Sequence, residues 1–300
     1  VRGAMASVQR AIRATRGALR DVASVTGWAA EAPEAAEALR GRHLVYFNGA
    51  FSPPTRAHAH IASAIAAEAD VDALWLDPEP ARPGKERWQD ETFEARVAMC
   101  ELMAADAGLG ALAGVGTLRR DLGPELGTSV ELFRTLRALL GGPGQGRLVW
   151  ALGADVFEGM RHWPDKARAC LQPGETCDGV ILFMRAGWSE KMLWAALQRV
   201  GHSPCDVQVM PMPPHLAAVS SHWARRALAS GGTELEQEDQ RVMLPSVARF
   251  CRSRPDIRRI YAEQVANTKA PAFGHPAQAE RAERWRESSG VARADSPPGP

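Results

Sequence analysis

The sequence predicts an α/β fold, a doubly wound Rossmann-like parallel sheet that forms a single domain with flexible ends. Its 300 residues, 45% of them hydrophobic, are enough to bury one sizeable core. Short apolar runs bounded by Gly, Pro or Asp are typical of buried strands. Segments with apolar residues at helical intervals alternate with these runs. We therefore expect one domain over residues 42–253.

The predicted strands are short runs of Val, Leu, Ile and Ala. They cover residues 44–47, 73–76, 111–118, 148–152, 180–184 and 207–210. None approaches the ~20 apolar residues of a membrane-spanning helix, so we expect no membrane contact. Ligands of such sheets bind beyond the carboxyl ends of the strands, so the loops that follow these runs are the expected location of a site.

Helices are predicted between the strands, over residues 58–69, 92–105 and 128–140. In the second of these, Phe93, Val97, Cys100 and Met103 recur at helical spacing. The third begins with a capping-box pattern, in which the Thr128 and Glu131 side chains would cap the first turn.

The two ends are expected to lie outside the domain. Residues 1–41 carry five arginines before their first acid, Asp21, which resembles an organelle transit peptide; a solvated helix is the alternative. Residues 254–300 form a tail that we expect to be disordered after about 270, where apolar periodicity is lost. The expected location is the cytoplasm, or an organelle if the N-terminal segment is a transit peptide.

Charge and cysteine content exclude several classes of protein. Thirty-six Lys and Arg against 35 Asp and Glu give a net charge of +1, so we expect no nucleic-acid partner. The five cysteines are odd in number and form no CxxC pair, so they indicate neither a disulfide framework nor a zinc site. The sequence carries no signal of the oligomeric state.

The loop after the first strand has the features of a phosphate site. Gly49 allows close backbone approach, and the helix that follows offers unpaired N–H groups to an anion. His58, in the first turn of that helix, could donate to the same phosphate; a purely structural histidine is the alternative. His60 is two residues on and faces another side of the helix, so no metal is predicted at this His pair.

A second constellation lies about 160 residues further on, at 219–226. If Ser221 caps a helix there, its hydroxyl and the first amides face an anion, and Arg225 projects over the same end. The guanidinium would supply a forked donor to phosphate oxygens. A capped surface helix without a ligand is the alternative.

A third constellation follows the strand at 148–152. The carboxylate of Asp155, two residues after Gly153, could accept hydrogen bonds from a ribose. Trp163 could stack on a cationic pyridinium ring, although it could equally be a core residue. Arg185 follows the next strand.

The first of these loops resembles the nucleotidyltransferase signature G-x-F-x-P-x-[HT]-x-x-H. Its matching residues are Gly49, Phe51, Pro53, Thr55 and His58. Thr55 in place of the first histidine looks like the variant of the nicotinamide/nicotinate mononucleotide adenylyltransferases. Ser52 departs from the usual Asn or Asp.

Further motifs resemble that family in the same chain order. Ser220 to Arg225 is similar to I-S-S-T-x-[IV]-R, with His222 in place of Thr. Gly153, Asp155 and Trp163 resemble its G-x-D…W spacing. Likenesses at 185–188 and 244–250 bring the number of motifs to five, and a weaker likeness covers 96–99. Five motifs in order, each after a strand or at a helix start, favour a divergent member of the family.

The resemblance implies transfer of an adenylyl group from ATP to nicotinamide or nicotinate mononucleotide, which yields NAD or deamido-NAD and pyrophosphate. Mg²⁺ would accompany ATP, with no protein metal ligands. The implied catalytic residues are His58 and Arg225. The implied ATP- and phosphate-binding residues are Gly49, Ala50, Phe51, Thr55, Lys85, Gly153, Asp155, Ser220 and Ser221, and those for the mononucleotide are Ser129, Trp163 and Arg185.

Two alternatives remain. Another nucleotidyltransferase, such as a pantetheine-phosphate adenylyltransferase or a cytidylyltransferase, would share the first loop. A nucleotide-binding regulator without turnover would explain the departures at Ser52 and His222. The sequence does not decide between the amide and the acid form of the mononucleotide.

Overall fold

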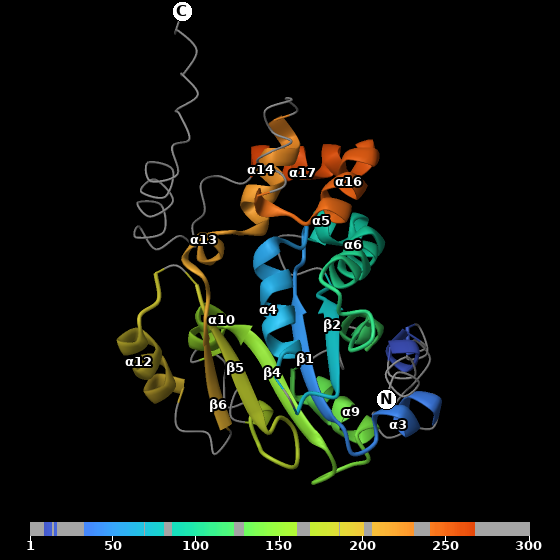
Figure 1. Cartoon of the computed structure of the whole chain (residues 1–300), viewed down its shortest axis with the longest axis vertical. Coiled ribbons are helices and arrows are strands. Elements are labelled where there is room, and N and C mark those ends of the chain that lie inside the picture. Colours follow the sequence, from blue (N-terminus) through green and yellow to red (C-terminus); the bar gives the residue numbers. More distant parts are fainter. Residues whose placement is uncertain are drawn as a thin grey trace, which may run out of the picture.

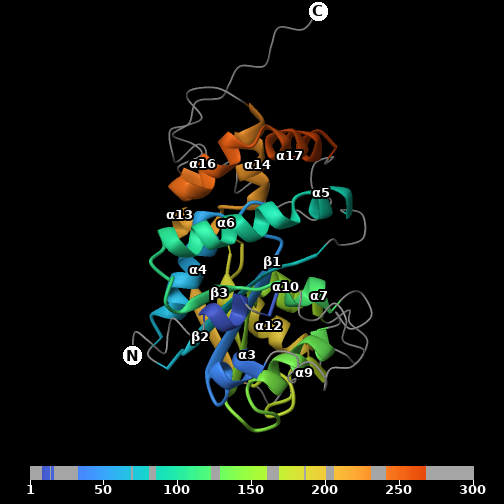
Figure 2. The same ribbon diagram turned by 90° about the vertical axis from the view of Figure 1, so that its right-hand side faces the viewer.

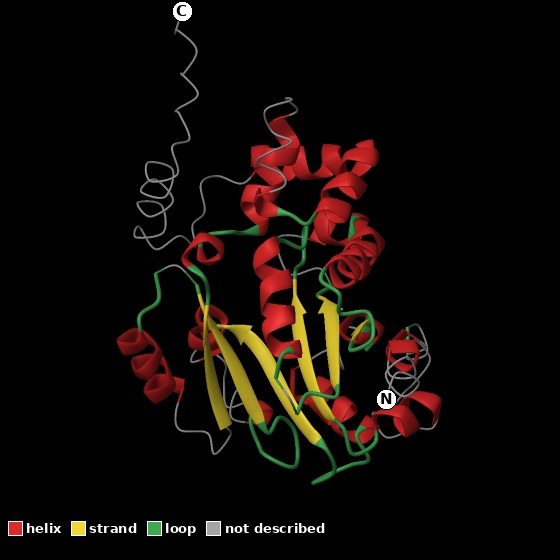
Figure 3. Cartoon of the chain, viewed as in Figure 1, coloured by secondary structure: helices red, strands yellow, loops and turns green. Residues whose placement is uncertain are grey.

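The computed structural model describes residues 9–13, 15–16, 33–68, 70–80, 86–122, 129–160, 169–185, 187–200, 206–230 and 241–267. Within them, a six-stranded sheet has helices on both faces (Figures 1 and 3). The strands are β1 (His43–Gly49), β2 (Ala73–Pro78), β3 (Ala113–Val115), β4 (Arg147–Gly153), β5 (Gly179–Met184) and β6 (Asp206–Pro211).

The sheet has the order β3-β2-β1-β4-β5-β6, and every neighbouring pair is parallel. The register pairs Phe47 of β1 with Leu76 of β2 on one side and with Ala151 of β4 on the other. The strand order reverses between β1 and β4, and doubly wound sheets bind ligands at such a point. The predicted fold class is confirmed.

Helices surround the sheet or cap its carboxyl edge. They are α3 (Pro33–Leu39), α4 (Arg56–Ala66), α5 (Glu86–Glu91), α6 (Phe93–Asp106), α7 (Leu118–Asp121), α9 (Ser129–Leu139), α10 (Ala154–Gly159), α12 (Glu190–Val200), α13 (Pro214–Ala217), α14 (Ser221–Ser230), α16 (Pro245–Ser253) and α17 (Pro255–Asn267). Two views at right angles place α14, α16 and α17 together beyond the strand ends (Figures 1 and 2). No described helix is both long enough and apolar enough to span a bilayer.

The predicted elements agree with the observed ones except around β3. The run at 111–118 forms a strand only over Ala113–Val115. Gly116 and Thr117 leave the extended conformation, and Leu118 then starts the short helix α7. The Thr117 hydroxyl donates to Asp121 over 2.6 Å, a local bond that favours this turn over a longer strand. Thr128, the expected cap of α9, lies outside the described residues.

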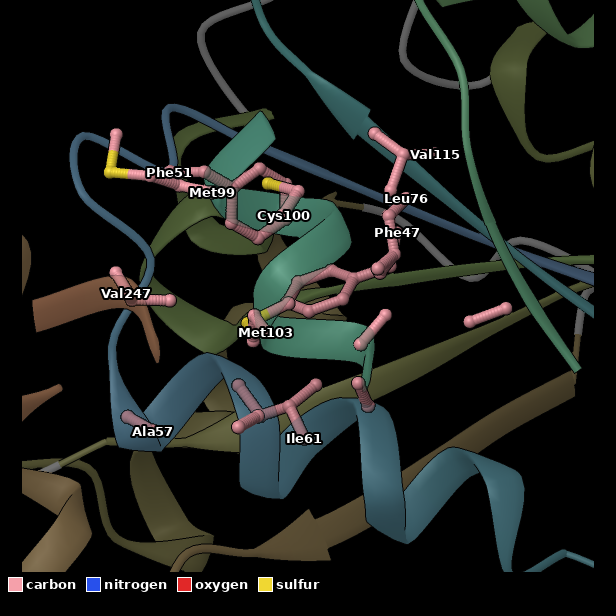
Figure 4. Close-up of a cluster of buried hydrophobic side chains, with 14 of the residues drawn as sticks. Phe47, Phe51, Ala57, Ile61, Leu76, Met99, Cys100, Met103, Val115 and Val247 are labelled. Atoms are coloured by element: carbon pink, nitrogen blue, oxygen red, sulfur yellow. The ribbon is translucent and has the colours of Figure 1, made fainter. Parts of the chain in front are cut away.

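Side-chain alternation along the strands builds two hydrophobic cores, one on each face of the sheet. Val45 and Phe47 of β1 face the core formed with α4, α6, α16 and α17, whereas Leu44 and Tyr46 face the core formed with α3, α9, α10 and α12. In the first core, Phe47 packs between α4 and α6, where Ile61 and Met103 approach it (Figure 4). Both faces of β1 are therefore covered.

Segments on both sides of residues 42–253 contribute to these cores. Ile257 and Tyr261 of α17 are fully buried in the first core. Ile12 is buried in the second, and the Arg16 guanidinium donates to the Val115 carbonyl and to Glu101. The described unit therefore extends beyond residue 253 to at least residue 267.

Gly116 is required by the packing of Trp75. A Cβ added at Gly116 would lie 2.2 Å from the Trp75 Nε1 atom and 2.5 Å from Cε2. Because the indole is completely buried, it cannot move without disturbing the core.

We therefore expect Gly116→Ala to lower the free energy of unfolding by about 1–3 kcal/mol through overpacking. Gly110→Ala is the matched control, since nothing lies within 4 Å of its added Cβ. Urea unfolding of both variants measures the difference, and equal stability would contradict this account of the Trp75 site.

Candidate active site

The loop between β1 and α4 is held by side chains from two distant helices. Arg96 of α6 donates to the Ala50 carbonyl over 2.7 Å and to the Glu79 carbonyl over 2.8 Å. Arg225 of α14 donates to the Ser52 carbonyl over 2.5 Å, and the Ser221 hydroxyl donates to the Pro53 carbonyl over 2.8 Å. The loop backbone is therefore fixed at three carbonyl groups, those of Ala50, Ser52 and Pro53.

Phe51 lies at the tip of this loop in a left-handed conformation, with φ of 42°. That conformation is costly for a residue with a side chain and persists only where the surroundings impose it. Its buried ring packs edge-on against Phe47 and His58 at centroid distances of 5.3 and 5.1 Å. The aromatic contacts and the carbonyl clamp together provide that constraint.

His58 has a defined hydrogen-bonding state. The backbone N–H of Thr55 donates to its Nδ1 over 3.0 Å, so Nδ1 is the acceptor and the ring proton is on Nε2. The Thr55 hydroxyl also lies 2.8 Å from Nδ1, and together the two residues form a capping box at the start of α4. The ring therefore presents an N–H donor from Nε2.

Burial keeps that ring neutral. Loss of solvent, with a smaller contribution from the positive charge of Arg185, lowers the pKa of His58 from 6.5 to about 3. The side chain can thus donate a hydrogen bond at neutral pH without first gaining a proton. It suits an oxygen that already carries negative charge.

The ends of β4 and β5 bring a second set of predicted residues to the same edge. Gly153 caps α10 and leaves room for its neighbours, since an added Cβ would lie 2.4 Å from Asp155 Oδ1 and 4.0 Å from Arg185 Nε. The exposed Asp155 and the half-buried Arg185 therefore lie over the strand ends, with Arg185 also acting on His58. A carboxylate and a guanidinium can then meet the sugar and phosphate of one ligand.

The start of α14 brings a third set of predicted residues to the carboxyl edge of the sheet. Ser220 and Ser221 lie at the helix start, where the Ser220 hydroxyl accepts from the Trp223 amide over 3.5 Å. Arg225 is mostly enclosed, and burial lowers the pKa of its guanidinium. Among the described residues, its buried Nε has no hydrogen-bond partner. Burial, Arg225 and Arg226 lower the pKa of His222, which replaces the Thr of the motif.

The structure thus brings together one group of predicted residues around the 49–58 loop and the ends of β4 and β5. These are Gly49, Ala50, Phe51, Thr55, His58, Gly153, Asp155, Arg185, Ser220, Ser221 and Arg225. Ser129 is buried at the first turn of α9, which precedes β4 and so starts at the carboxyl edge of the sheet. Lys85 and Trp163 lie outside the described residues.

Sequence reasoning missed a buried polar network beside β1. The Tyr46 hydroxyl donates to Asp77 Oδ2 over 2.6 Å, and the Arg119 amide donates to the same atom over 3.1 Å. Asn48 links the buried Glu79 carboxylate, over 2.7 Å, to the Trp150 indole N–H, over 2.8 Å. The sequence did contain a sign of this network, since two acids, Asp77 and Glu79, directly follow the apolar residues of β2.

A second missed feature is the pair of buried side chains under the loop. Arg96 and Tyr261 are both fully buried, and the positive charges of Arg96 and Arg225 oppose the burial that raises the pKa of the Tyr261 hydroxyl. Arg96 was noted only as part of a motif, and α17 was expected to be tail. Nothing in the local pattern indicates that a helix after residue 253 returns to the loop.

A parallel sheet of this order, with a glycine-to-histidine loop after β1 and a serine–arginine helix facing it, defines an α/β protein of the nucleotide-binding class. No family model matches the chain. Three curated relatives share the name "Probable nicotinate-nucleotide adenylyltransferase". The relative from Myxococcus xanthus (strain DK1622) is 32% identical over 147 residues, which are 48% of this chain and 70% of the relative.

The other two are similar over a shorter stretch. The relative from Agrobacterium fabrum (strain C58 / ATCC 33970) is 27% identical over 39% of this chain and 58% of its own length. The relative from Rhizobium meliloti (strain 1021) is 29% identical over 40% and 58%. The chain belongs to the nicotinate-nucleotide adenylyltransferase family.

Solved structures agree on the fold. Plasmodium falciparum nicotinic acid mononucleotide adenylyltransferase complexed with NaAD has a TM-score of 0.54 and 15% identity, with 70% of this chain and 94% of that chain covered. The same enzyme complexed with APC has a TM-score of 0.52, 14% identity and the same coverage. At this identity the likeness concerns the fold alone.

The buried Asp77 makes stability depend on pH. Burial raises its pKa from 3.8 to about 7, against the opposing hydrogen bond from Tyr46. Between these two values the folded protein retains a proton that the unfolded chain has released, so stability decreases as pH rises.

We expect the free energy of unfolding to fall by about 2 kcal/mol more in the wild type than in Asp77→Asn between pH 5 and pH 8. The amide mimics the protonated acid and removes the titration. Glu37→Gln, at an exposed position of α3, is the control that should retain the wild-type slope. Identical slopes for Asp77→Asn and the wild type would refute the assignment.

Proposed function

We propose that this chain transfers the adenylyl group of ATP to nicotinate mononucleotide and releases deamido-NAD and pyrophosphate. The observation that carries the proposal is the neutral, buried His58 donor in a clamped loop between β1 and α4, in a chain whose curated relatives bear the name of this activity. A phosphoryl transfer between two bound nucleotides needs placed donors and no protein nucleophile.

In the proposed mechanism, the phosphate of the mononucleotide attacks the α-phosphorus of ATP in line, and the bond to the pyrophosphate breaks. The α-phosphate gains negative charge as this happens. The Nε2 N–H of His58 donates a hydrogen bond to that group, and the proton stays on the ring. The imidazole is neutral, and its Nδ1 is held by the Thr55 amide. Arg225 stabilises the departing pyrophosphate.

The two substrates are proposed to occupy neighbouring parts of the carboxyl edge. Gly49, Ala50, Phe51, Ser220 and Ser221 would bind the phosphates of ATP through backbone and hydroxyl groups, with Lys85 closing over them. Gly153 and Asp155 would face its ribose. Ser129, Arg185 and Trp163 would receive the mononucleotide, with the indole stacked on the pyridinium ring.

Mg²⁺ is proposed to enter with ATP. The described residues contain no group of three His, Cys, Asp or Glu side chains suited to a metal, and an ion coordinated by phosphate oxygens and water needs no such group. When bound, it would neutralise charge on the phosphates. His58, Arg225 and Arg185 would act on the remaining oxygens.

Pyrophosphate release tests this function directly. The purified chain is incubated with ATP alone and then with ATP plus nicotinate mononucleotide, its amide or phosphopantetheine. We expect pyrophosphate and deamido-NAD only with a mononucleotide, and faster turnover with the acid. Turnover with phosphopantetheine alone would favour the rival transferase, and nucleotide binding without any turnover would favour a regulator.

We expect His58→Ala to lower kcat by roughly 10²-fold or more, the scale lost when a preorganised donor to developing charge is removed. His58→Gln retains a neutral N–H donor near the Nε2 position, and so we expect an intermediate rate. Neither limb of the wild-type pH–rate profile between pH 5 and pH 8 should follow protonation of this imidazole. A folded His58→Ala enzyme with normal turnover would refute the role.

Arg225→Lys retains the charge but cannot bond two phosphate oxygens and the Ser52 carbonyl together. We expect kcat/KM for ATP to fall roughly tenfold or more, with a smaller change in the KM for the mononucleotide. Arg226→Lys, at the exposed neighbouring position of α14, is the matched control. Unchanged ATP saturation in Arg225→Lys would restrict Arg225 to a structural role.

A further inference from the structure

A cavity opens on the side of α4 that faces away from the sheet. Its volume is about 800 Å³, within the range of pockets that take small organic molecules. It is bounded by α4, by α13 and the start of α14, by the end of α6 and by residues 241–244. These elements come together in front of the carboxyl edge (Figure 1).

None of the lining residues is among those placed in the candidate active site, although Val219 and Trp223 flank Ser220 and Ser221 in the chain. Its α4 residues are Arg56, Ala59, His60 and Ser63, which share one helix face at intervals of three and four. His58 lies on another face of α4, and Ile61 points into the core beside Met103 (Figure 4). A molecule in this cavity would therefore lie across α4 from the phosphates of the proposed reaction.

Its chemistry is that of an apolar floor with a cationic rim. Leu216 and Val219 are buried in the floor, and Trp223, Val242 and Leu244 extend it. The titratable side chains among the described lining residues are Arg56, His60, His215 and Arg241, and no Asp or Glu is among them. The rim therefore complements an anion, while the floor excludes water from an apolar ring or chain.

We propose that this cavity is a second ligand site, which takes an amphipathic organic anion with an apolar ring or chain on Leu216 and Val219 and a carboxylate, sulfonate or phosphate head at the Arg241 and His215 rim. Nothing in this inference depends on the proposed reaction. A nucleotide is a poorer fit, since its polar sugar would cover the apolar floor.

The test uses two dyes of nearly the same shape that differ in charge. Anilinonaphthalene sulfonate is anionic and N-phenylnaphthylamine is neutral, and both fluoresce strongly in apolar surroundings. The whole chain is titrated with each dye, with ATP at saturation and no mononucleotide, so that the candidate active site is occupied. We expect saturable binding of the anion at one site, about tenfold or more tighter than that of the neutral dye.

Variants assign the signal to this cavity. Arg241→Glu should weaken binding of the anionic dye about tenfold or more and leave the neutral dye unaffected, and Ser63→Trp should fill the cavity and abolish both signals. Arg249→Glu, an exposed charge reversal on α16 outside the lining, should change neither. Circular dichroism verifies that each variant is folded.

The proposal is overturned if the two dyes bind equally well, or if Arg241→Glu binds the anionic dye as the wild type does. Unchanged binding in a folded Ser63→Trp protein would also overturn it, because the dye would then occupy another surface. The Arg241→Glu result decides the question even if Ser63→Trp fails to fold.

Discussion

The site depends on the hydrogen bonds that hold the carbonyl oxygens of the β1–α4 loop. Arg96 and Arg225 come from α6 and α14, far apart in sequence, and bind this loop from within the protein. Two enclosed guanidinium groups are costly to desolvate, and bonds to carbonyl dipoles offset part of that cost. Their positive charges remain beneath the loop, so in the proposed reaction the same groups that fix the backbone would also attract the phosphates of the ligand.

The state of His58 follows from that arrangement. A loop held by its carbonyls keeps the Thr55 amide aimed at Nδ1, and the aromatic rings of Phe47 and Phe51 exclude water from the imidazole. Desolvation then disfavours the charged ring, while the Thr55 bond selects the tautomer with the proton on Nε2. The orientation, tautomer and charge of the proposed catalytic donor thus have a common origin in the packing around the loop.

The sequence predicted much of this because the informative patterns are local. Strand runs bounded by Gly and Pro located five strands closely, and the spacing from Gly49 to His58 predicted the loop and helix start. The strand predicted at 111–118 was too long, because the hydrogen bond between the Thr117 and Asp121 side chains favours a turn there. Arg96 holds carbonyls 46 and 17 residues earlier in the chain, and Tyr261 reaches the same loop from α17, so neither role leaves a local pattern.

Acidic and basic side chains are distributed unevenly around β1. On the face of β1 that carries Tyr46, Asp77 and Glu79 are buried, whereas Arg96 and Arg225 hold the loop that follows the strand. Two ionised carboxylates so near the proposed phosphate site would weaken its attraction for anions. Burial raises the pKa of Asp77 to about 7, so this acid is partly neutral at physiological pH, and Glu79 is bonded to Asn48 and lies 4.0 Å from the Arg119 guanidinium. The network therefore reduces the negative charge beside the strand ends, where we propose that the phosphates bind.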